Sequence, residues 1–205
     1  AVVRTHIEDK KYRQAIWVVP ADGGEAHKFT NGPKSDKSPR WSPDGTTLAF
    51  VSDRDGANQI WTIGMDGGEA RQVTKGKLSI AEVCWSPDGK KFAFVSKWAP
   101  GDDQTSEPKS ESDVRVITRI KYKADGKGFW DGKWLHIYVT DAESGDARRV
   151  TCGEFDHANP AWSPDSSMLA FVANRSENAD YTNVSDVWVA PVEGGQPRKV
   201  TGSIG

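Results

Sequence analysis

Short apolar runs recur along this chain, and each follows a turn signal. The runs are LAFVS from Leu48, FAFVS from Phe92 and LAFVA from Leu169. Because they are continuously apolar and do not alternate with polar residues, they predict β-strands in sheets that are covered on both faces. Each run follows a Trp-Ser-Pro-Asp segment, which begins at Trp41, Trp85 and Trp162. Three copies of one phrase predict a repeat architecture, in which each unit buries its apolar surface against its neighbours.

The copies are separated by one regular period and one longer gap. Trp41 and Trp85 are 44 residues apart, whereas Trp85 and Trp162 are 77 residues apart. Two further landmarks repeat with the spacing of 44, namely Trp17 with Trp61 and Thr30 with Thr74. A period near 44 falls in the range of about 40–45 residues that is typical of a four-stranded propeller blade.

Each unit divides into four short strands. The first ends at the Trp, the second is the apolar run, the third carries an Ile-Trp landmark or its equivalent, and the fourth ends at a Thr. Ser-Pro-Asp-Gly joins the first two strands, because Pro presets φ, Asp bonds back to the backbone and Gly tolerates positive φ. In the third copy Ser166 replaces this Gly, so we expect a turn that is strained or of another type.

These patterns predict an all-β fold, a β-propeller of four-stranded antiparallel blades that is incomplete within residues 1–205. Three full blades are expected over residues 38–74, 82–151 and 158–201, and residues 1–30 supply most of a fourth without its first strand. Closed propellers have typically 4–8 blades. We therefore expect two open blade faces, which favour self-association or pairing with a missing half.

The longer gap places an insertion of 33 extra residues inside the unit at residues 82–151, over about residues 99–133. Its first part, Ala99–Asp113, is polar and acidic and is expected to be a mobile loop. Asp102 and Asp103 have no third ligand at a recognised spacing, so we expect no metal site. The second part, Val114–Val139, is basic and rich in β-branched residues, and it predicts a long hairpin that leads into the third strand.

The composition agrees with this fold. Only 36% of the residues are hydrophobic and the mean hydropathy is −0.64, yet nine residues are Trp. A propeller has thin layers between blades, which a few large aromatic side chains fill, so we expect the Trp residues to pack there. A net charge of −2 argues against a nucleic-acid partner. No apolar run approaches the roughly 18 residues that cross a membrane, so no membrane partner is expected either.

The candidate chemistry is sparse. Cys84 and Cys152 do not make a disulfide framework, and we expect both to be free thiols. His157 follows Asp156, but neighbouring residues on a strand point to opposite faces, so we expect structural roles for all four His and no acid–base pair. The first residues lack the apolar segment of a signal peptide. We therefore expect a cytoplasmic protein, with a processed exported protein as the alternative.

The repeat and two longer segments of the sequence resemble known protein families. The repeat SPDGxxLAFVSxRDGxxQIW…DGGEARQVT is similar to the propeller repeat of the TolB family and of the prolyl oligopeptidase family. VVRTHIEDKKYRQAIWVVPADGGEAHKFT (Val2–Thr30) resembles the opening blade of bacterial acylaminoacyl peptidases and dipeptidyl aminopeptidase-like members. VITRIKYKADGKGFWDGKWLHIYV (Val116–Val139) resembles their insertion in the middle of the propeller.

This resemblance implies a seven-bladed propeller joined to an α/β-hydrolase domain with a Ser-Asp-His triad. In that family the propeller covers the active site and admits peptides but not folded proteins. Arg119, Lys121 and Tyr122 in the inserted hairpin are then the candidates for holding a substrate terminus.

No catalytic residue is expected in the chain itself. A nucleophile elbow needs Gly-x-Ser-x-Gly, and no such motif occurs among the 205 residues. Two hypotheses therefore stand. In the first, the chain is the propeller portion of a serine peptidase that gates peptide entry, docks the hydrolase domain and uses no cofactor. In the second, it is a TolB-like module for protein–protein interaction.

Overall fold

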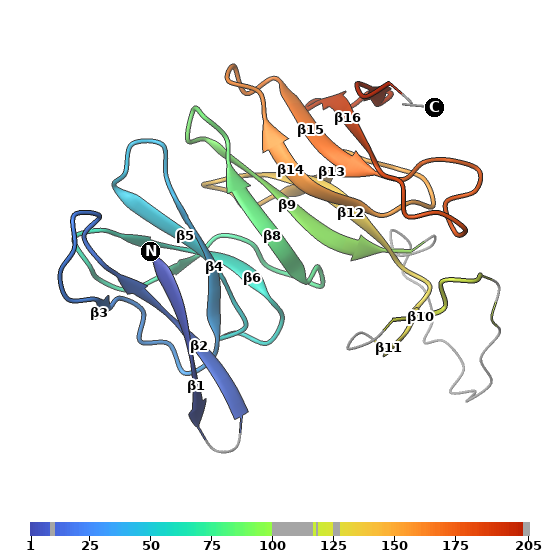
Figure 1. Cartoon of the computed structure of the whole chain (residues 1–205). Coiled ribbons are helices and arrows are strands. Elements are labelled where there is room, and N and C mark those ends of the chain that lie inside the picture. Colours follow the sequence, from blue (N-terminus) through green and yellow to red (C-terminus); the bar gives the residue numbers. More distant parts are fainter. Residues whose placement is uncertain (9–10, 100–116, 118, 125–127, 203–205) are drawn as a thin grey trace.

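The computed structural model describes residues 1–205 except 9–10, 100–116, 118, 125–127 and 203–205. The described residues contain strands and turns and no α-helix. Their strands form four antiparallel sheets, which follow one another from the N-terminus to the C-terminus (Figure 1), and one small two-stranded hairpin. The predicted fold class, an incomplete all-β propeller, is confirmed.

Each sheet is one blade, and its strands follow in chain order. The first blade has β1 (Val2–Glu8), β2 (Lys11–Val18) and β3 (His27–Lys28). The second has β4 (Asp36–Trp41), β5 (Thr47–Ser52), β6 (Gln59–Gly64) and β7 (Arg71–Gln72). The third has β8 (Ile80–Trp85), β9 (Lys91–Trp98), β12 (Trp134–Asp141) and β13 (Ala147–Arg149). The fourth has β14 (His157–Trp162), β15 (Met168–Ala173), β16 (Asp186–Pro191) and β17 (Arg198–Lys199).

The Ser-Pro-Asp turn is built in the same way in all three copies. The Ser hydroxyl donates a hydrogen bond to the Asp carboxylate, at 2.5 Å for Ser42–Asp44, 2.6 Å for Ser86–Asp88 and 2.5 Å for Ser163–Asp165. The Asp carboxylate also accepts the backbone N–H two residues later, at 3.1 Å in each copy. These bonds, the Ser hydroxyl first, lower the pKa of all three carboxyls, that of Asp165 to about 2.

Ser166 adopts the conformation of the glycine that it replaces. Its φ is 60°, and φ is 72° at Gly45 and 70° at Gly89. Of the two expected alternatives, the strained turn is the one observed, because a residue with a side chain here takes a left-handed conformation. The Ser166 hydroxyl accepts a hydrogen bond from the backbone N–H of Asp88 at 3.3 Å, so this side chain joins the turns of two neighbouring blades.

A threonine closes every blade by the same hydrogen bond. Its hydroxyl accepts the backbone N–H of a residue in the third strand, 14 residues earlier. The four pairs are Ile16–Thr30 at 3.1 Å, Ile60–Thr74 at 2.9 Å, Ile137–Thr151 at 3.0 Å and Val187–Thr201 at 3.1 Å. This bond satisfies a donor at a place where the short outer strand has already ended.

The apolar core lies between blades. One cluster joins the first two blades through Ile16 and Phe50, a second joins the second and third through Val51 and Phe94, and a third joins the third and fourth through Val95 and Phe171. Four of the eight partly buried Trp residues pack against these clusters, namely Trp61, Trp85, Trp162 and Trp188, whereas Trp41 is 40% exposed.

The threonine bond gives a test of blade stability. Thr151→Val leaves the buried Ile137 N–H without its acceptor, so the free energy of unfolding should fall by about 1–3 kcal/mol. Thr201→Val changes the same bond at an exposed site and should cost less than half as much. Urea unfolding of both variants measures this; equal losses would show that burial of the bond does not matter.

Candidate functional site

The inserted segment, residues 99–133 between β9 and β12, contains a small hairpin. It pairs β10 (Lys123–Ala124) with β11 (Gly128–Phe129), and the Tyr122 carbonyl accepts the Trp130 N–H at 2.8 Å. The predicted hairpin is therefore present and leads into β12, but in the described residues its paired strands β10 and β11 have two residues each and are shorter than expected. Among the described residues of this segment, Ile117, Ile120 and Tyr122 lie outside the strands and are exposed. The acidic segment with Asp102 and Asp103 lies outside the described residues.

Arg119 anchors the insertion to the fourth blade. Its Nε and Nη2 donate to Asp180 Oδ1 at 3.1 and 2.5 Å. Its guanidinium carbon also lies 4.7 Å from the Trp130 ring centre and 4.4 Å from that of Trp134. Only 12% of the Arg119 side chain is exposed. The cation is therefore held between two indole rings and a carboxylate.

Lys121 makes a second connection to the same loop. Its ammonium donates to the carbonyls of Ala179 at 2.7 Å and Thr182 at 2.5 Å. Both carbonyls belong to the fourth-blade loop, residues 174–185, which joins β15 to β16. Two of the three predicted substrate-binding residues thus hold two long loops together.

Tyr122 differs from Arg119 and Lys121, because its side chain is not fastened to the fourth-blade loop by a hydrogen bond in the described residues. Its side chain is 42% exposed, and its ring centre lies 6.2 Å from that of Phe129. It belongs to a set of exposed apolar side chains on the insertion and the fourth-blade loop, which we call the apolar rim: Ile117, Ile120, Tyr122, Phe129, Tyr181 and Val184.

The apolar rim has a counterpart on the first blade. Ile7 is 69% exposed and Tyr12 is 77% exposed near the turn between β1 and β2. In Figure 1 the end of β1, the start of β2 and the strands β10 and β11 lie at the same end of the blades. Exposed apolar patches mark interaction sites on soluble proteins, so this end is the candidate functional face.

Sequence reasoning did not find Asp180, Trp130 or Trp134 as partners of Arg119. Asp180 is 61 residues away along the chain. A signal was present in the sequence, because Trp130 and Trp134 are, with Trp98, the three Trp residues that stand outside the repeat positions of the blades. Departure from the repeat could have marked them as belonging to the insertion.

Two buried histidines meet between the third and fourth blades. His136 on β12 and His157 on β14 are fully buried, and their ring centres are 5.0 Å apart. His136 Nδ1 contacts the Thr151 hydroxyl at 3.1 Å, and His157 Nδ1 contacts the Leu135 carbonyl at 3.1 Å. Burial first, and then the neighbouring His157, lowers the pKa of His136 to about 3, and burial lowers the pKa of His157 to about 4.

Asp156 does not form a relay with His157. Its carboxylate accepts the Leu135 N–H at 2.8 Å, while His157 contacts the carbonyl of the same residue. Both side chains therefore hold the start of β12. His6 and His27 are exposed. In the described part of the chain no cluster of three or more metal-ligating side chains occurs.

The two thiols are not joined. Cys84 donates a hydrogen bond to the Pro160 carbonyl at 3.3 Å, and burial raises the pKa of its thiol to about 11. Cys152 is exposed. Both are free, as predicted. Within the described ranges, no helix is long and apolar enough to span a membrane.

The architecture of stacked four-stranded antiparallel sheets defines a class of fold, the β-propellers. The family model of the Tricorn protease N-terminal beta propeller domain matches residues 11–124. The chain therefore belongs to the Tricorn protease N-terminal beta propeller domain family. Among curated proteins, it is 35% identical over 195 residues to the uncharacterized peptidase YuxL of Bacillus subtilis (strain 168).

The chain spans a minor part of that relative. The match covers 92% of the chain and 30% of YuxL. Among solved structures, the acylaminoacyl peptidase of Pyrococcus horikoshii matches with a TM-score of 0.70 and 19% identity, over 98% of this chain and 30% of that one. A putative TolB from Agrobacterium tumefaciens matches with a TM-score of 0.64 and 18% identity, over 96% and 59%. At these identities the solved structures show the fold.

The Arg119 anchor can be tested directly. Arg119→Ala should release the insertion from the fourth-blade loop, because Asp180 and two indole rings lose their common partner. We expect amide hydrogen exchange in residues 176–182 to become at least tenfold faster, with β9 unchanged. Arg119→Lys keeps the charge but not the planar guanidinium, so its exchange rate should lie between those of the unchanged protein and of Arg119→Ala. Unchanged exchange in the loop would show that Lys121 alone holds it.

The histidine pair makes a prediction about pH. The unfolded chain takes up protons on these imidazoles near pH 6.5, but the folded chain does so only near pH 4 and below. The unfolded state thus binds more protons between pH 6.5 and 4, so the free energy of unfolding should fall as pH decreases through this window.

Urea unfolding at pH 7 and pH 5 measures the effect. His157→Gln should lessen the loss between these two pH values, whereas His6→Gln, at an exposed position, should not change it. An identical pH dependence for both variants would contradict the assignment.

Proposed function

We propose that this chain is the non-catalytic propeller portion of a prolyl oligopeptidase-family serine peptidase that cleaves short peptides, in the manner of acylaminoacyl peptidases. The observation that carries the proposal is the insertion in the third blade, fastened to the fourth-blade loop by Arg119 and Lys121. The relationship to a protein named as a peptidase supports it. The catalytic Ser, Asp and His then belong to an α/β-hydrolase domain outside residues 1–205.

The candidate functional face suits the docking of such a domain. The apolar rim and the exposed Ile7 and Tyr12 lie at one end of the blades. Covering these side chains removes apolar area from water, which is favourable at about 25 cal/mol per Å². The gate for peptides is then the space between the docked domain and this face, and the insertion forms one side of it.

Tyr122 is the predicted substrate contact whose side chain is left available by this geometry. Arg119 and Lys121 already use their charges on Asp180 and on loop carbonyls, so they position the rim. We therefore assign a substrate-facing role to Tyr122 and a positioning role to Arg119 and Lys121. The cytoplasm is the compartment that we propose, and peptides are the partners.

A second candidate function is a TolB-like module that binds a protein partner. The putative TolB from Agrobacterium tumefaciens supports it, because the match covers 59% of that chain, against 30% of the peptidase. The same apolar rim would then be the interaction surface.

Hydrolysis assays separate the two functions. The 205-residue chain alone should hydrolyse no peptide, since it has no nucleophile elbow. The full-length protein should release the acylated residue from short N-acylated peptides, leave a folded protein intact, and lose activity with a serine-directed organophosphate. Turnover by the 205-residue chain, or no peptide turnover by the full-length protein, would refute the peptidase assignment.

The proposal that the insertion borders the peptide entrance is tested with separate variants of the full-length protein. Arg119→Ala should raise KM for short peptides several-fold and admit longer ones, because the rim loses its anchor. Lys90→Ala, at the opposite end of the blades, is the matched control. Equal kinetics for the two variants would mean that the insertion does not border the gate.

A further inference from the structure

The fourth blade repeats an arginine that forms an ion pair in the second blade. Arg54 and Arg175 occupy the same position, two residues after the end of β5 and of β15. The Arg54 side chain donates to the Ser52 hydroxyl at 3.1 Å and to the Asp36 carboxylate at 2.7 Å. Asp36 is 1% exposed, so a buried carboxylate and a guanidinium neutralise each other in the second blade.

Both acceptors of this arginine are replaced in the fourth blade. The ladder between β4 and β5 pairs Asp36 with Ser52. The equivalent pair between β14 and β15 is His157 with Ala173. Alanine has no hydroxyl, and an imidazole takes the place of the carboxylate. Within the described ranges Arg175 therefore forms no hydrogen bond or ion pair, and its Nη1 is buried without an acceptor.

The aromatic contacts of the arginine are kept. The Arg54 guanidinium carbon lies 4.9 Å from the Trp61 ring centre. The Arg175 guanidinium carbon lies 5.2 Å from the ring centre of Trp188, which has the same position in its blade and packs against the cluster between the third and fourth blades. Phe155 adds a second ring at 5.3 Å. These rings attract the Arg175 cation but supply no oxygen acceptor for its N–H groups.

His157 does not supply the missing negative charge. Its ring is fully buried, and its Nδ1 donates to the Leu135 carbonyl at 3.1 Å, which leaves Nε2 as the lone-pair nitrogen of the neutral ring. This Nε2 is also buried without a partner. Burial first, with Arg175 among the further causes, lowers the pKa of His157 to about 4. The imidazole is therefore neutral near pH 7.

The carboxylates that are close to these residues in the sequence do not pair with Arg175 either. Asp156 accepts a backbone N–H of β12 at 2.8 Å, and Asp180 already binds the insertion at 2.5 Å. Glu154 and Glu177 are exposed, and neither forms an ion pair in the part of the chain that the structure describes.

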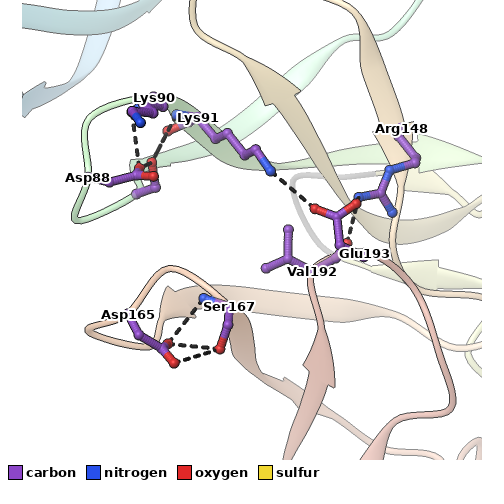
Figure 2. A network of polar contacts seen from close by, with 9 residues as sticks. Asp88, Lys90, Lys91, Arg148, Asp165, Ser167, Val192 and Glu193 are labelled. Carbon is purple, nitrogen blue, oxygen red and sulfur yellow. Dashed lines mark hydrogen bonds and ion pairs between the residues drawn. The ribbon is translucent and has the colours of Figure 1, made fainter.

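Other cations at the blade boundaries have acceptors. Arg148 and Lys91 of the third blade bind the Glu193 carboxylate of the fourth blade at 3.3 and 3.2 Å (Figure 2). Arg71 of the second blade donates to the Ala142 carbonyl of the third at 2.9 Å. Arg148 is exposed and Arg175 is half-buried, so the residue for which a missing acceptor costs more is the one that lacks it.

We propose that Arg175 is the centre of an anion site at the boundary between the third and fourth blades and that this site takes a carboxylate. A carboxylate is the group that the equivalent Arg54 binds within the chain, and its two oxygens match the planar guanidinium. One cation beside a neutral imidazole favours a ligand with a single negative charge. Small free acids and acidic side chains of peptides share this chemistry. The site is built by the third and fourth blades, so it does not depend on a hydrolase domain.

Amide hydrogen exchange of the full-length protein at pH 7 tests the site. Sodium acetate replaces sodium chloride at constant ionic strength up to about 100 mM, which covers a site of millimolar affinity. Exchange in residues 153–157 and 174–178 should slow several-fold, because a ligand of the folded state opposes local opening. Exchange in the equivalent residues 32–36 and 53–57 should not change, since Arg54 has its own carboxylate. No acetate effect around Arg175 would assign its Nη1 to a water molecule and overturn the proposal.

Substitutions separate this site from general effects of acetate. Arg175→Gln should abolish the effect, whereas Arg54→Gln should keep it. The double substitution of His157→Asp with Ala173→Ser rebuilds the acceptors of the second blade, so it should also abolish the effect. An acetate effect that survives Arg175→Gln would contradict the proposal.

The two arginines should also differ when no acetate is present. Arg54→Gln leaves the buried Asp36 without its cation and should speed exchange in β4 and β5 at least tenfold. Arg175→Gln removes a cation that has no acceptor, so it should change exchange in β14 and β15 little. Equal acceleration by the two substitutions would show that Arg175 has an internal partner, against the proposal.

A capped amino acid distinguishes the two sources of the carboxylate. If N-acetylated and C-amidated glutamate protects the same residues at lower concentration than acetate does, the ligand is an acidic side chain. If acetate alone protects them, the ligand is a small free acid. Capped glutamine is the control, and equal protection by it would show that the carboxylate is not recognised. None of these measurements uses peptidase activity, so the inference and the proposed function can fail separately.

Discussion

The structure depends on contact between neighbouring blades, because no blade can bury its own apolar side chains. Each sheet has alternate residues on two faces, and β5 and β9 are apolar on both. A blade with one neighbour leaves one of these faces half-buried, as β15 does. The stability of each blade is therefore set largely by the blades on either side, as in other repeat proteins.

Polar contacts complete this packing at the two ends of the blades. The Ser-Asp turns and the closing threonines satisfy donors where the ladders stop, and Arg71 and Arg148 reach across to the next blade. These contacts repeat because the backbone problem that they solve repeats. The buried His136–His157 pair occurs at one boundary, between the third and fourth blades, where burial lowers the pKa of both imidazoles.

Much of the fold could be read from the sequence, and less of the candidate site. The turn Pro and Asp, the apolar runs and the closing Thr are local signals, so the blades and most of their strands follow from them. The partner of Arg119 does not follow from local signals of this kind. Asp180 lies in a different blade, and only the closed geometry of two loops brings it to 2.5 Å. The hairpin predicted in the insertion is present, but its described strands are shorter than expected, because strand propensity needs a neighbouring strand and the sequence does not say how far one extends.

By itself the sequence determined the repeat, the blade as its unit and the position of the insertion, because the period and turn residues act over a few positions each. The tertiary structure alone decided what the charged residues do. Arg119 and Lys121 are candidate binding residues in the sequence, and the structure adds that both bond to the fourth-blade loop, whereas Tyr122 is 42% exposed. The sequence gives the charge of a residue, but the partner of that charge depends on which segments the fold brings together.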